Sequence, residues 1–424
     1  MPKYRMLRWR IFTCILFRHR KGKEVKVERK AFSTIEFECL LKKTDGGKMK
    51  LYRMELYKLC HRRIVIVGTF CVIGILLFFF VLKVSDEWAY VDGVTYHGYQ
   101  AVQVNRQITE EFKGVLTDEK VNAIVEKYGF PQEVVWDYGG FRDSNFLNNF
   151  VVEYLADGFM RGWEEGEYQV STMTYPIADT ELGAAGELTG QEIILAYTNG
   201  WGVFIDMTQV GMVLACILIL FSVSVLFAGE RQKKMLPLLF TTKEGRKKDI
   251  CMKIAAAFTV TVCIWLIVIL MGFIACRLVY GYDGIDSFVG ATNISFSIMA
   301  QSWSVSIWTV KHFLIVVVLR SFIGVMLLCA VTIYISAGCR SSFHAVSIAA
   351  VSYGLPVLLW FIMPIGFIFS LVRVLIYAST FYQCMCSSIY DVGRIWHILA
   401  AVAIVISIIC VIAACWKYKR QQDI

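Results

Sequence analysis

The sequence predicts an all-α polytopic membrane protein with six transmembrane helices and an α-rich extracellular domain between the first two helices. The chain of 424 residues is 57% hydrophobic and only 18% charged, whereas soluble proteins carry about 25% charged residues. Its apolar residues gather into six runs, each close to or above the roughly 20 residues that cross a bilayer core as a helix. The six spans are residues 64–82, 210–228, 254–276, 313–335, 346–369 and 398–415.

The distribution of charge predicts how the spans are oriented. Residues 83–209 contain 7 Lys and Arg against 21 Asp and Glu, whereas the rest of the chain contains 36 against 13. Basic clusters precede the first span, fill residues 243–253 and follow the last span. Because Lys and Arg favour the cytoplasmic side, we expect both termini in the cytoplasm. Residues 83–209 are then extracellular, and the chain is a multi-pass protein of the cell (plasma) membrane.

The N-terminal residues carry two separate predictions. Residues 1–48 are basic and poorly patterned, and are either a true cytoplasmic leader or an upstream extension of a reading frame that starts at Met49. In residues 49–63, apolar side chains alternate with Lys and Arg, which indicates a cytoplasmic interfacial helix. A solvated basic flank is the alternative for this second segment.

The extracellular domain, residues 83–209, shows two helical patterns. Thr117 can cap a helix with acidic residues in its first turn, and Gly129 with Pro131 ends that helix. A second apolar stripe runs from Phe146 to Leu155 and is closed by Gly158. The domain is therefore predicted to be mainly helical.

The connections between the later spans are expected to lie alternately on the two sides of the membrane. Residues 229–253 form a cytoplasmic loop, 277–312 an extracellular loop, 336–345 a cytoplasmic turn and 416–424 a cytoplasmic tail. Residues 370–397 are extracellular but still apolar. They form either a re-entrant helical pair that dips into the outer leaflet or a loop on the surface.

Catalytic patterns are missing from the sequence. It contains no phosphate-binding Gly-x4-Gly-Lys-Ser/Thr loop, no His-Glu-x-x-His pair and no Gly-x-Ser-x-Gly elbow. We therefore expect no enzyme activity and no catalytic, cofactor-binding or metal-binding residues in this chain. Arg320 is the one charge within the spans, and a charge there is costly unless it is satisfied. It either snorkels or pairs within the bundle, or it lines a substrate path.

The cytoplasmic loop after the second span carries the most specific pattern. From Gly229 to Arg246 it reads GERQKKMLPLLFTTKEGR, and Lys253 precedes the next span. An acid follows the span, and a short apolar group stands among basic residues. This pattern is typical of a helix under the membrane that exposes apolar side chains to a partner. A loop that lies along the membrane is the alternative.

The acid, the Leu-Leu and Thr-Thr pairs, the Gly-Arg pair and the later Lys resemble the permeases of the ABC type-2 exporter family, in the branch with a large extracellular domain between the first two spans. In that family this loop is a coupling helix that binds a separate ATPase. The resemblance implies a main ATPase contact formed by Glu230, Leu236, Leu238, Leu239, Thr241, Thr242, Gly245 and Arg246. It implies a second contact formed by Ser336, Arg340 and Ser341.

The resemblance also implies the function. The chain would be the permease subunit of an ABC exporter that moves a hydrophobic or amphiphilic substrate out of the cell. ATP and Mg would bind in the partner ATPase, and the chain would pair with a copy of itself or with another permease chain in the lipid bilayer, without nucleic acid. One alternative is an ABC-coupled signalling or mechanotransmission protein through which nothing passes. A second is an ion-coupled secondary transporter.

Overall fold

The computed structural model describes residues 47–129, 143–155, 161–164, 167–169, 174–235, 248–292, 307–362, 370–385 and 395–420. The chain divides into two compact units, residues 1–54 and 55–424. Helix α3 (Gly47–Cys60) begins in the first unit and ends in the second. It forms a helix over most of residues 49–63, where one was expected, whereas its place at a membrane surface stays a prediction. All other described elements belong to the second unit.

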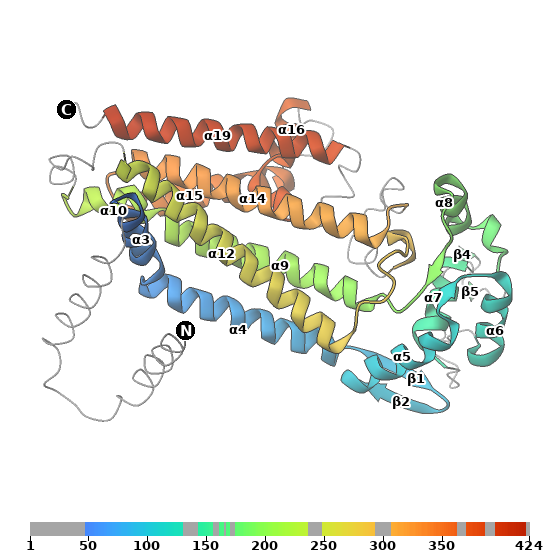
Figure 1. Ribbon diagram of the computed structural model, residues 1–424. Coiled ribbons are helices and arrows are strands. Elements are labelled where there is room, and N and C mark those ends of the chain that lie inside the picture. The colour runs from blue at the N-terminus through green and yellow to red at the C-terminus, as the bar shows by residue number, and fades with distance from the viewer. Residues whose placement is uncertain are drawn as a thin grey trace, which may run out of the picture. The chain divides into compact units, whose positions relative to one another are not determined.

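Six helices in the described part of the chain are long and apolar enough to cross a membrane, which confirms the all-α polytopic fold. They lie side by side as a bundle (Figure 1). The spans are α4 (Arg63–Ser85), α9 with α10 (Asn199–Val223 and Val225–Gln232), α12 (Lys248–Val279), α14 (Val310–Gly338), α15 (Ser342–Ile362) and α19 (Trp396–Arg420). The second span starts earlier than expected, so its helix includes residues 199–209. The end of the fifth run, residues 363–369, lies outside the described residues.

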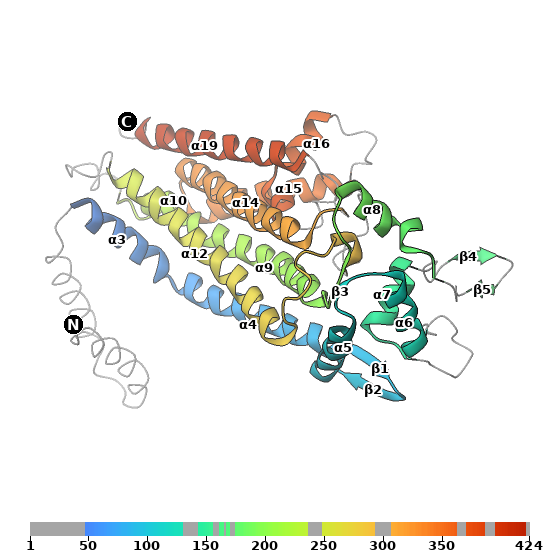
Figure 2. The ribbon, with the colours of Figure 1, turned by 45° about the vertical axis from the view of Figure 1, so that its right-hand side comes forward.

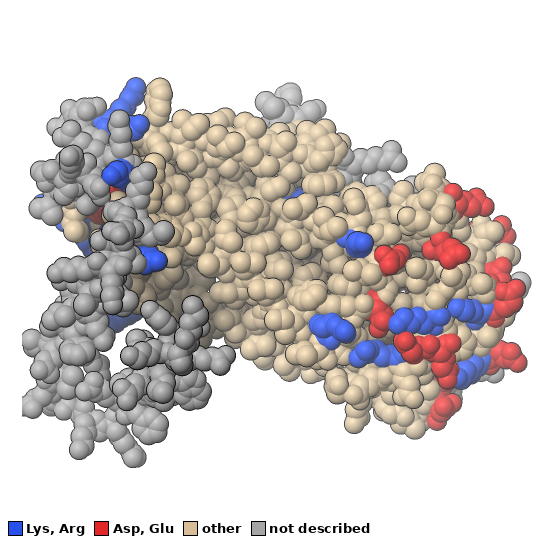
Figure 3. Space-filling model, in the orientation of Figure 1, with Lys and Arg blue, Asp and Glu red and all other residues tan. Residues whose placement is uncertain are grey.

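The two ends of the bundle differ in charge. We call one the basic end, because Arg62, Lys233, Lys248 and Lys417 lie there at the ends of their helices. The other is the domain end, where the residues between the first two spans are folded. On the face shown in Figure 3, the Asp and Glu side chains gather mainly at the domain end, and the middle is almost free of charge. This division matches the charge asymmetry from which the orientation was predicted.

Helix α9 occupies the centre of the bundle because small residues let its neighbours approach. Gly211 shows this most clearly. A Cβ added there would lie 2.4 Å from Val268 Cγ1 on α12 and 3.3 Å from a Leu76 methyl carbon on α4. Small residues at helix contacts are the usual means by which spans pack closely in a bilayer. Any larger residue at position 211 would push α4 or α12 away.

The described residues between Asp86 and Thr198 form what we call the inter-span domain (Figure 2). Its longest elements are helices, and its strands form three two-stranded antiparallel pairs in the described ranges. The elements are β1 (Trp88–Val91), β2 (Val94–His97), α5 (Tyr99–Phe112), β3 (Gly114–Val115), α6 (Asp118–Tyr128), α7 (Phe146–Leu155), β4 (Arg161–Glu164), β5 (Glu167–Gln169), η1 (Ile177–Asp179), α8 (Glu181–Thr189) and β6 (Ile194–Leu195). The mainly helical character expected of this region is confirmed.

Both helical patterns of the inter-span domain occur where they were expected. Thr117 caps α6, since its hydroxyl accepts a hydrogen bond from the Lys120 amide at 3.3 Å. Gly129 ends α6 with a φ of 70°, a left-handed value that favours glycine. The second apolar stripe forms α7 and is largely buried. The predicted terminator, Gly158, lies outside the described residues.

The domain is fastened to the loop after α12. The Lys113 ammonium of the domain pairs with the Asp283 carboxylate at 2.7 Å, and the Trp201 indole at the start of α9 donates to the Asp283 carbonyl at 2.8 Å. The Ser287 hydroxyl donates to the Ile194 carbonyl at 2.9 Å. This loop also contains the short helix η2 (Val289–Ala291). The second and third spans therefore hold the domain jointly.

Two short helices, α16 (Ser370–Tyr377) and α17 (Thr380–Cys384), precede the last span. Helix α17 packs against the middle of α14, where a Cβ added at Gly324 would lie 2.7 Å from Cys384 Sγ. Arg320, on the same part of α14, is 1% exposed and donates to Gln383 Oε1 at 3.2 Å and to the Tyr382 carbonyl at 2.9 Å. Arg320 thus pairs inside the bundle. A re-entrant helical pair would contact a span halfway along its length, as α17 contacts α14.

Candidate functional site

At the basic end, the second span is interrupted between α9 and α10. The interruption at Ser224 is stabilised from α14 by Ser336, whose hydroxyl donates to the Ser224 carbonyl at 2.6 Å. The same hydroxyl accepts from the amides of Phe227 and Ala228 at 3.1 and 3.2 Å. These amides are in the first turn of α10, where a helix has no internal acceptors. One buried hydroxyl therefore fixes the start of α10 against α14.

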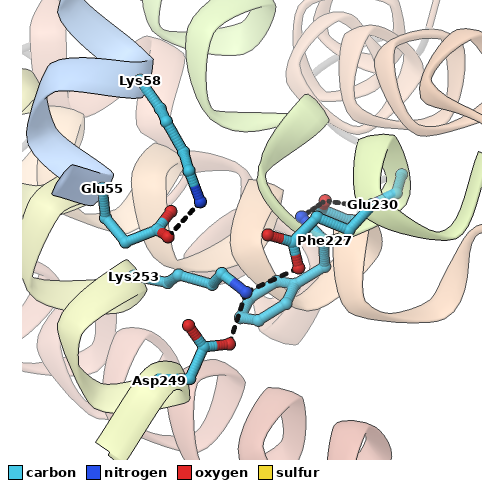
Figure 4. Close-up of polar contacts among 8 residues, drawn as sticks. Glu55, Lys58, Phe227, Glu230, Asp249 and Lys253 are labelled. Carbon is cyan, nitrogen blue, oxygen red and sulfur yellow. Dashed lines mark hydrogen bonds and ion pairs between the residues drawn. The ribbon is translucent and has the colours of Figure 1, made fainter. Parts of the chain in front are cut away.

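A buried ion cluster joins α10 to α12 (Figure 4). Lys253, whose side chain is 0% exposed, pairs with Glu230 at 2.5 Å and with Asp249 one turn earlier on its own helix. Its ammonium also lies 6.0 Å from the centre of the Phe227 ring. Two carboxylates thus surround one ammonium on the two helices that flank residues 236–247.

The energetics of this cluster favour positioning over net stability. Taking an ion out of water costs several kcal/mol, and the attraction of its partners in the interior roughly offsets that cost. Removing only one member, however, leaves an uncompensated buried charge. The cluster therefore penalises any movement that separates Glu230 from Lys253, and so it holds α10 and α12 in one relative position.

Helix α10 is tied to three further spans. The Arg231 guanidinium donates to the carbonyls of Ala337 and Cys339 at the end of α14, the latter at 3.1 Å. A cation is favourable at a helix C-terminus. Gln232 Oε1 accepts from the Ser342 amide at the start of α15 at 3.2 Å. The Phe227 ring packs on Tyr418 of α19, with 4.9 Å between the ring centres.

A groove of about 610 Å³ lies between α3 and α10. Its walls combine the charged side chains of Glu55, Lys58 and Arg62 with apolar residues such as Leu226 and the exposed Met235. Glu55 and Lys58 form an ion pair at 2.5 Å along α3. Burial lowers the pKa of the Arg62 guanidinium, and the nearby Glu55 carboxylate opposes that shift. The groove opens next to the point where α10 leads into residues 236–247.

Comparison with protein families decides what kind of protein carries this site. The family described as ABC-2 family transporter protein matches residues 51–421, which is most of the chain. The chain belongs to the ABC-2 transporter family. It is therefore a multi-pass membrane component of ABC transport, a permease subunit. No curated protein and no solved structure was found to match the chain.

The structure describes four of the residues that the resemblance to ABC-2 permeases assigned to ATPase contacts. Glu230 faces Lys253 inside the ion cluster, and Ser336 is fully buried where it holds the start of α10. Arg340 is exposed, and Ser341 accepts from the Phe343 amide at the start of α15. The remaining candidates, Leu236, Leu238, Leu239, Thr241, Thr242, Gly245 and Arg246, lie outside the described residues. The coupling roles stay predictions.

Several residues of the ABC-2 site were missed from the sequence. Asp249 stands four residues before Lys253, which is the spacing of neighbours on one helix face. This ion pair could therefore have been predicted from the sequence. Arg231, Gln232 and Tyr418 gave no such signal, because their partners are more than a hundred residues away. Among the described residues, no three His, Cys, Asp or Glu side chains are placed to hold a metal ion.

Proposed function

We propose that the chain is the permease subunit of an ABC exporter and that a separate ATPase binds its basic end from the cytoplasm. The observation that carries the proposal is the attachment of α10 to four other spans. The loop predicted to meet the ATPase begins just after α10 and ends at α12, and the ion cluster joins these two helices. A push on that loop would therefore reach α12, α14, α15 and α19 without any further hinge.

In this scheme the ATPase supplies the chemistry, with ATP and Mg bound in its own fold. The permease converts movement into a change of access by packing alone, since interfaces of this kind switch between discrete arrangements. The basic end faces the cytoplasm by the positive-inside rule, and the inter-span domain is outside the cell. The substrate expected from such a bundle is hydrophobic or amphiphilic, and it leaves the cell.

A second permease chain completes the proposed path, and α15 is the best candidate for the contact. It is the least buried of the six spans. Ser347, Ala350 and Gly354 follow one another at spacings of three and four, so they share one helix face. A Cβ added at Gly354 would meet nothing within 4 Å. Small residues on one face let two spans approach closely in lipid, which supports a dimer through α15.

The test is co-purification of the ATPase. The chain is co-expressed with ATPases encoded beside its gene, isolated in detergent, and compared with a variant in which Leu238→Asp and Leu239→Asp are combined. We expect the parent chain to retain an ATPase and the double variant to lose it. Leu188→Asp is the matched control, since Leu188 is an exposed leucine of α8 in the inter-span domain. It should retain the ATPase fully.

Two outcomes would contradict the proposal. If no ATPase is retained by the parent chain, an ion-coupled transporter replaces the exporter. If the double variant retains the ATPase as well as the control does, the coupling loop is not the docking site. Reconstitution of the complex in vesicles then separates export from mechanotransmission, because only an exporter moves an amphiphile across the bilayer when ATP is added.

A further inference from the structure

A second cavity, also of about 610 Å³, lies at the domain end, between the inter-span domain and the outer ends of the first two spans. It is far from the coupling site and is formed within one chain. Helix α4 runs almost directly into β1 beside it, and α5, which contacts α4 and α7, contributes one wall. The volume is within the range of about 300–1,000 Å³ that is typical of sites for small molecules.

The charges that line this outer cavity are unbalanced. They are Lys83, Asp86, Glu87, Glu153 and Asp206. Lys83 is already paired with Asp206 at 2.7 Å. No cation of the described chain forms an ion pair with Asp86, Glu87 or Glu153. Among the described residues, three carboxylates of the cavity therefore have no ion-pair partner.

Two of these carboxylates are partly removed from water. Burial raises the pKa of Glu153, and burial also raises the pKa of Glu87, with the Tyr280 hydroxyl, the Asn199 amide and the Lys83 charge opposing the shift. A half-buried carboxylate without an ion-pair partner is an unfavourable arrangement. A bound cation would relieve it.

A buried amide also lies in the wall of the cavity. Asn145 lines it and is 1% exposed. Its Oδ1 accepts from the amides of Leu147 and Asn148 at 3.0 and 3.2 Å. Its Nδ2 has no hydrogen-bond partner within the described residues. A buried amide without a partner costs about 1–3 kcal/mol, and this nitrogen has no contact with the open part of the cavity.

Apolar and aromatic side chains, among them Trp88, Phe146 and Phe150, form another part of the wall, beside several asparagines. Metal ions fit the site poorly, since no three acidic or His side chains among the described residues are grouped to hold one. We propose that this outer cavity binds an organic cation: a drug-sized molecule that combines an amine or guanidinium with an apolar or aromatic body. The carboxylates attract the cation, and the aromatic wall holds the body.

The probe for the test is N-dansyl-1,5-diaminopentane, which carries an amine, sulfonyl oxygens and an aromatic body. The neutral control is the alcohol of the same length, in which a hydroxyl replaces the amine. The full chain is placed in phosphatidylcholine nanodiscs without any ATPase, and binding is followed by fluorescence anisotropy. We expect saturable binding of the amine, at one molecule per chain, and little binding of the alcohol.

Variants locate the binding. Glu153→Gln should weaken binding of the amine about tenfold, which is the contribution of one charge-assisted hydrogen bond. Asp86→Asn removes a second carboxylate charge of the cavity. Asp86 is exposed, so this substitution should not destabilise the fold. Glu126→Gln, on an exposed face of α6, is the matched control and should bind as the parent does.

The proposal is overturned if the amine and the alcohol bind equally, or if neither variant weakens binding while both still melt as the parent does. It is also overturned if calcium ions displace the amine at one ion per chain, because the site would then be a metal site. Since no ATPase is present, these results do not depend on whether the chain works as an exporter.

Discussion

Replacing the buried lysine at the basic end tests the central link in the proposed coupling path. In Lys253→Met, the ammonium that lies 2.5 Å from Glu230 is lost, and two carboxylates with side chains only 15% and 3% exposed are left without it. Breaking a buried pair from one side costs about 3–5 kcal/mol. We therefore expect the variant to unfold at a clearly lower temperature than the parent chain.

The assay is thermal unfolding of the purified chain in detergent, followed by the reaction of a thiol dye with buried cysteines such as Cys329. The rescue is decisive. When Glu230→Gln and Asp249→Asn are added to Lys253→Met, no buried charge remains, and most of the loss should be recovered. Lys127→Met is the matched control. It breaks the ion pair with Glu111, whose two side chains are 49% and 55% exposed, and such a surface pair is worth about 0–1 kcal/mol.

The reasoning is refuted by either of two results. The first is a Lys253→Met variant that melts as the parent chain does, which would mean that the cluster does not hold α10 to α12. The second is a triple variant that melts no higher than the single one. In that case the loss would come from altered packing around Phe227 rather than from unpaired charge.

Two further predictions concern other parts of the chain. Gly354→Leu should reduce dimers on α15, measured by cross-linking in native membranes, whereas Gly74→Leu on α4, where an added Cβ also meets nothing within 4 Å, should not; equal effects would remove the argument for α15. Amine binding in the outer cavity should weaken on acidification from about pH 8 to about pH 5. The pKa values of Glu87 and Glu153 are raised, so these groups are ionised above the raised values and take up protons as the pH falls through them. A flat pH profile would contradict this.

What the sequence could predict was local. Runs of apolar residues were enough to find the six spans, because a helix in lipid satisfies its own backbone and needs no information from elsewhere. The helix cap at Thr117 and the helix end at Gly129 could likewise be predicted, since each depends only on residues a few positions away along the chain. The motif around Glu230 includes two members of the buried ion cluster, Glu230 and Lys253, whereas the ATPase contact predicted from the motif stays a prediction.

What could not be predicted depends on contacts between distant residues. The buried hydroxyl of Ser336 acts on backbone atoms 108 to 112 positions away. Arg320 is satisfied by a glutamine 63 positions later, on a helix that the sequence left open between two arrangements. No periodicity contains such pairings, because they arise only when the spans pack. Both the interruption in the second span and the anchoring of α17 therefore emerged from the structure alone.

The second span has one more consequence. From Asn199 to Gln232 it includes 34 residues, a length of about 50 Å at the usual helical rise. Its first turns line the outer cavity and its last turns line the groove at the basic end. The only interruption is clamped by Ser336, so a tilt imposed at one end is not absorbed there. Coupling between two binding events is reciprocal. If nucleotide binding to the proposed partner ATPase changes the affinity of the outer cavity for its ligand through this rod, that ligand must change the nucleotide affinity by the same factor. In the proposed orientation, the permease would then report the outside of the cell to the ATPase.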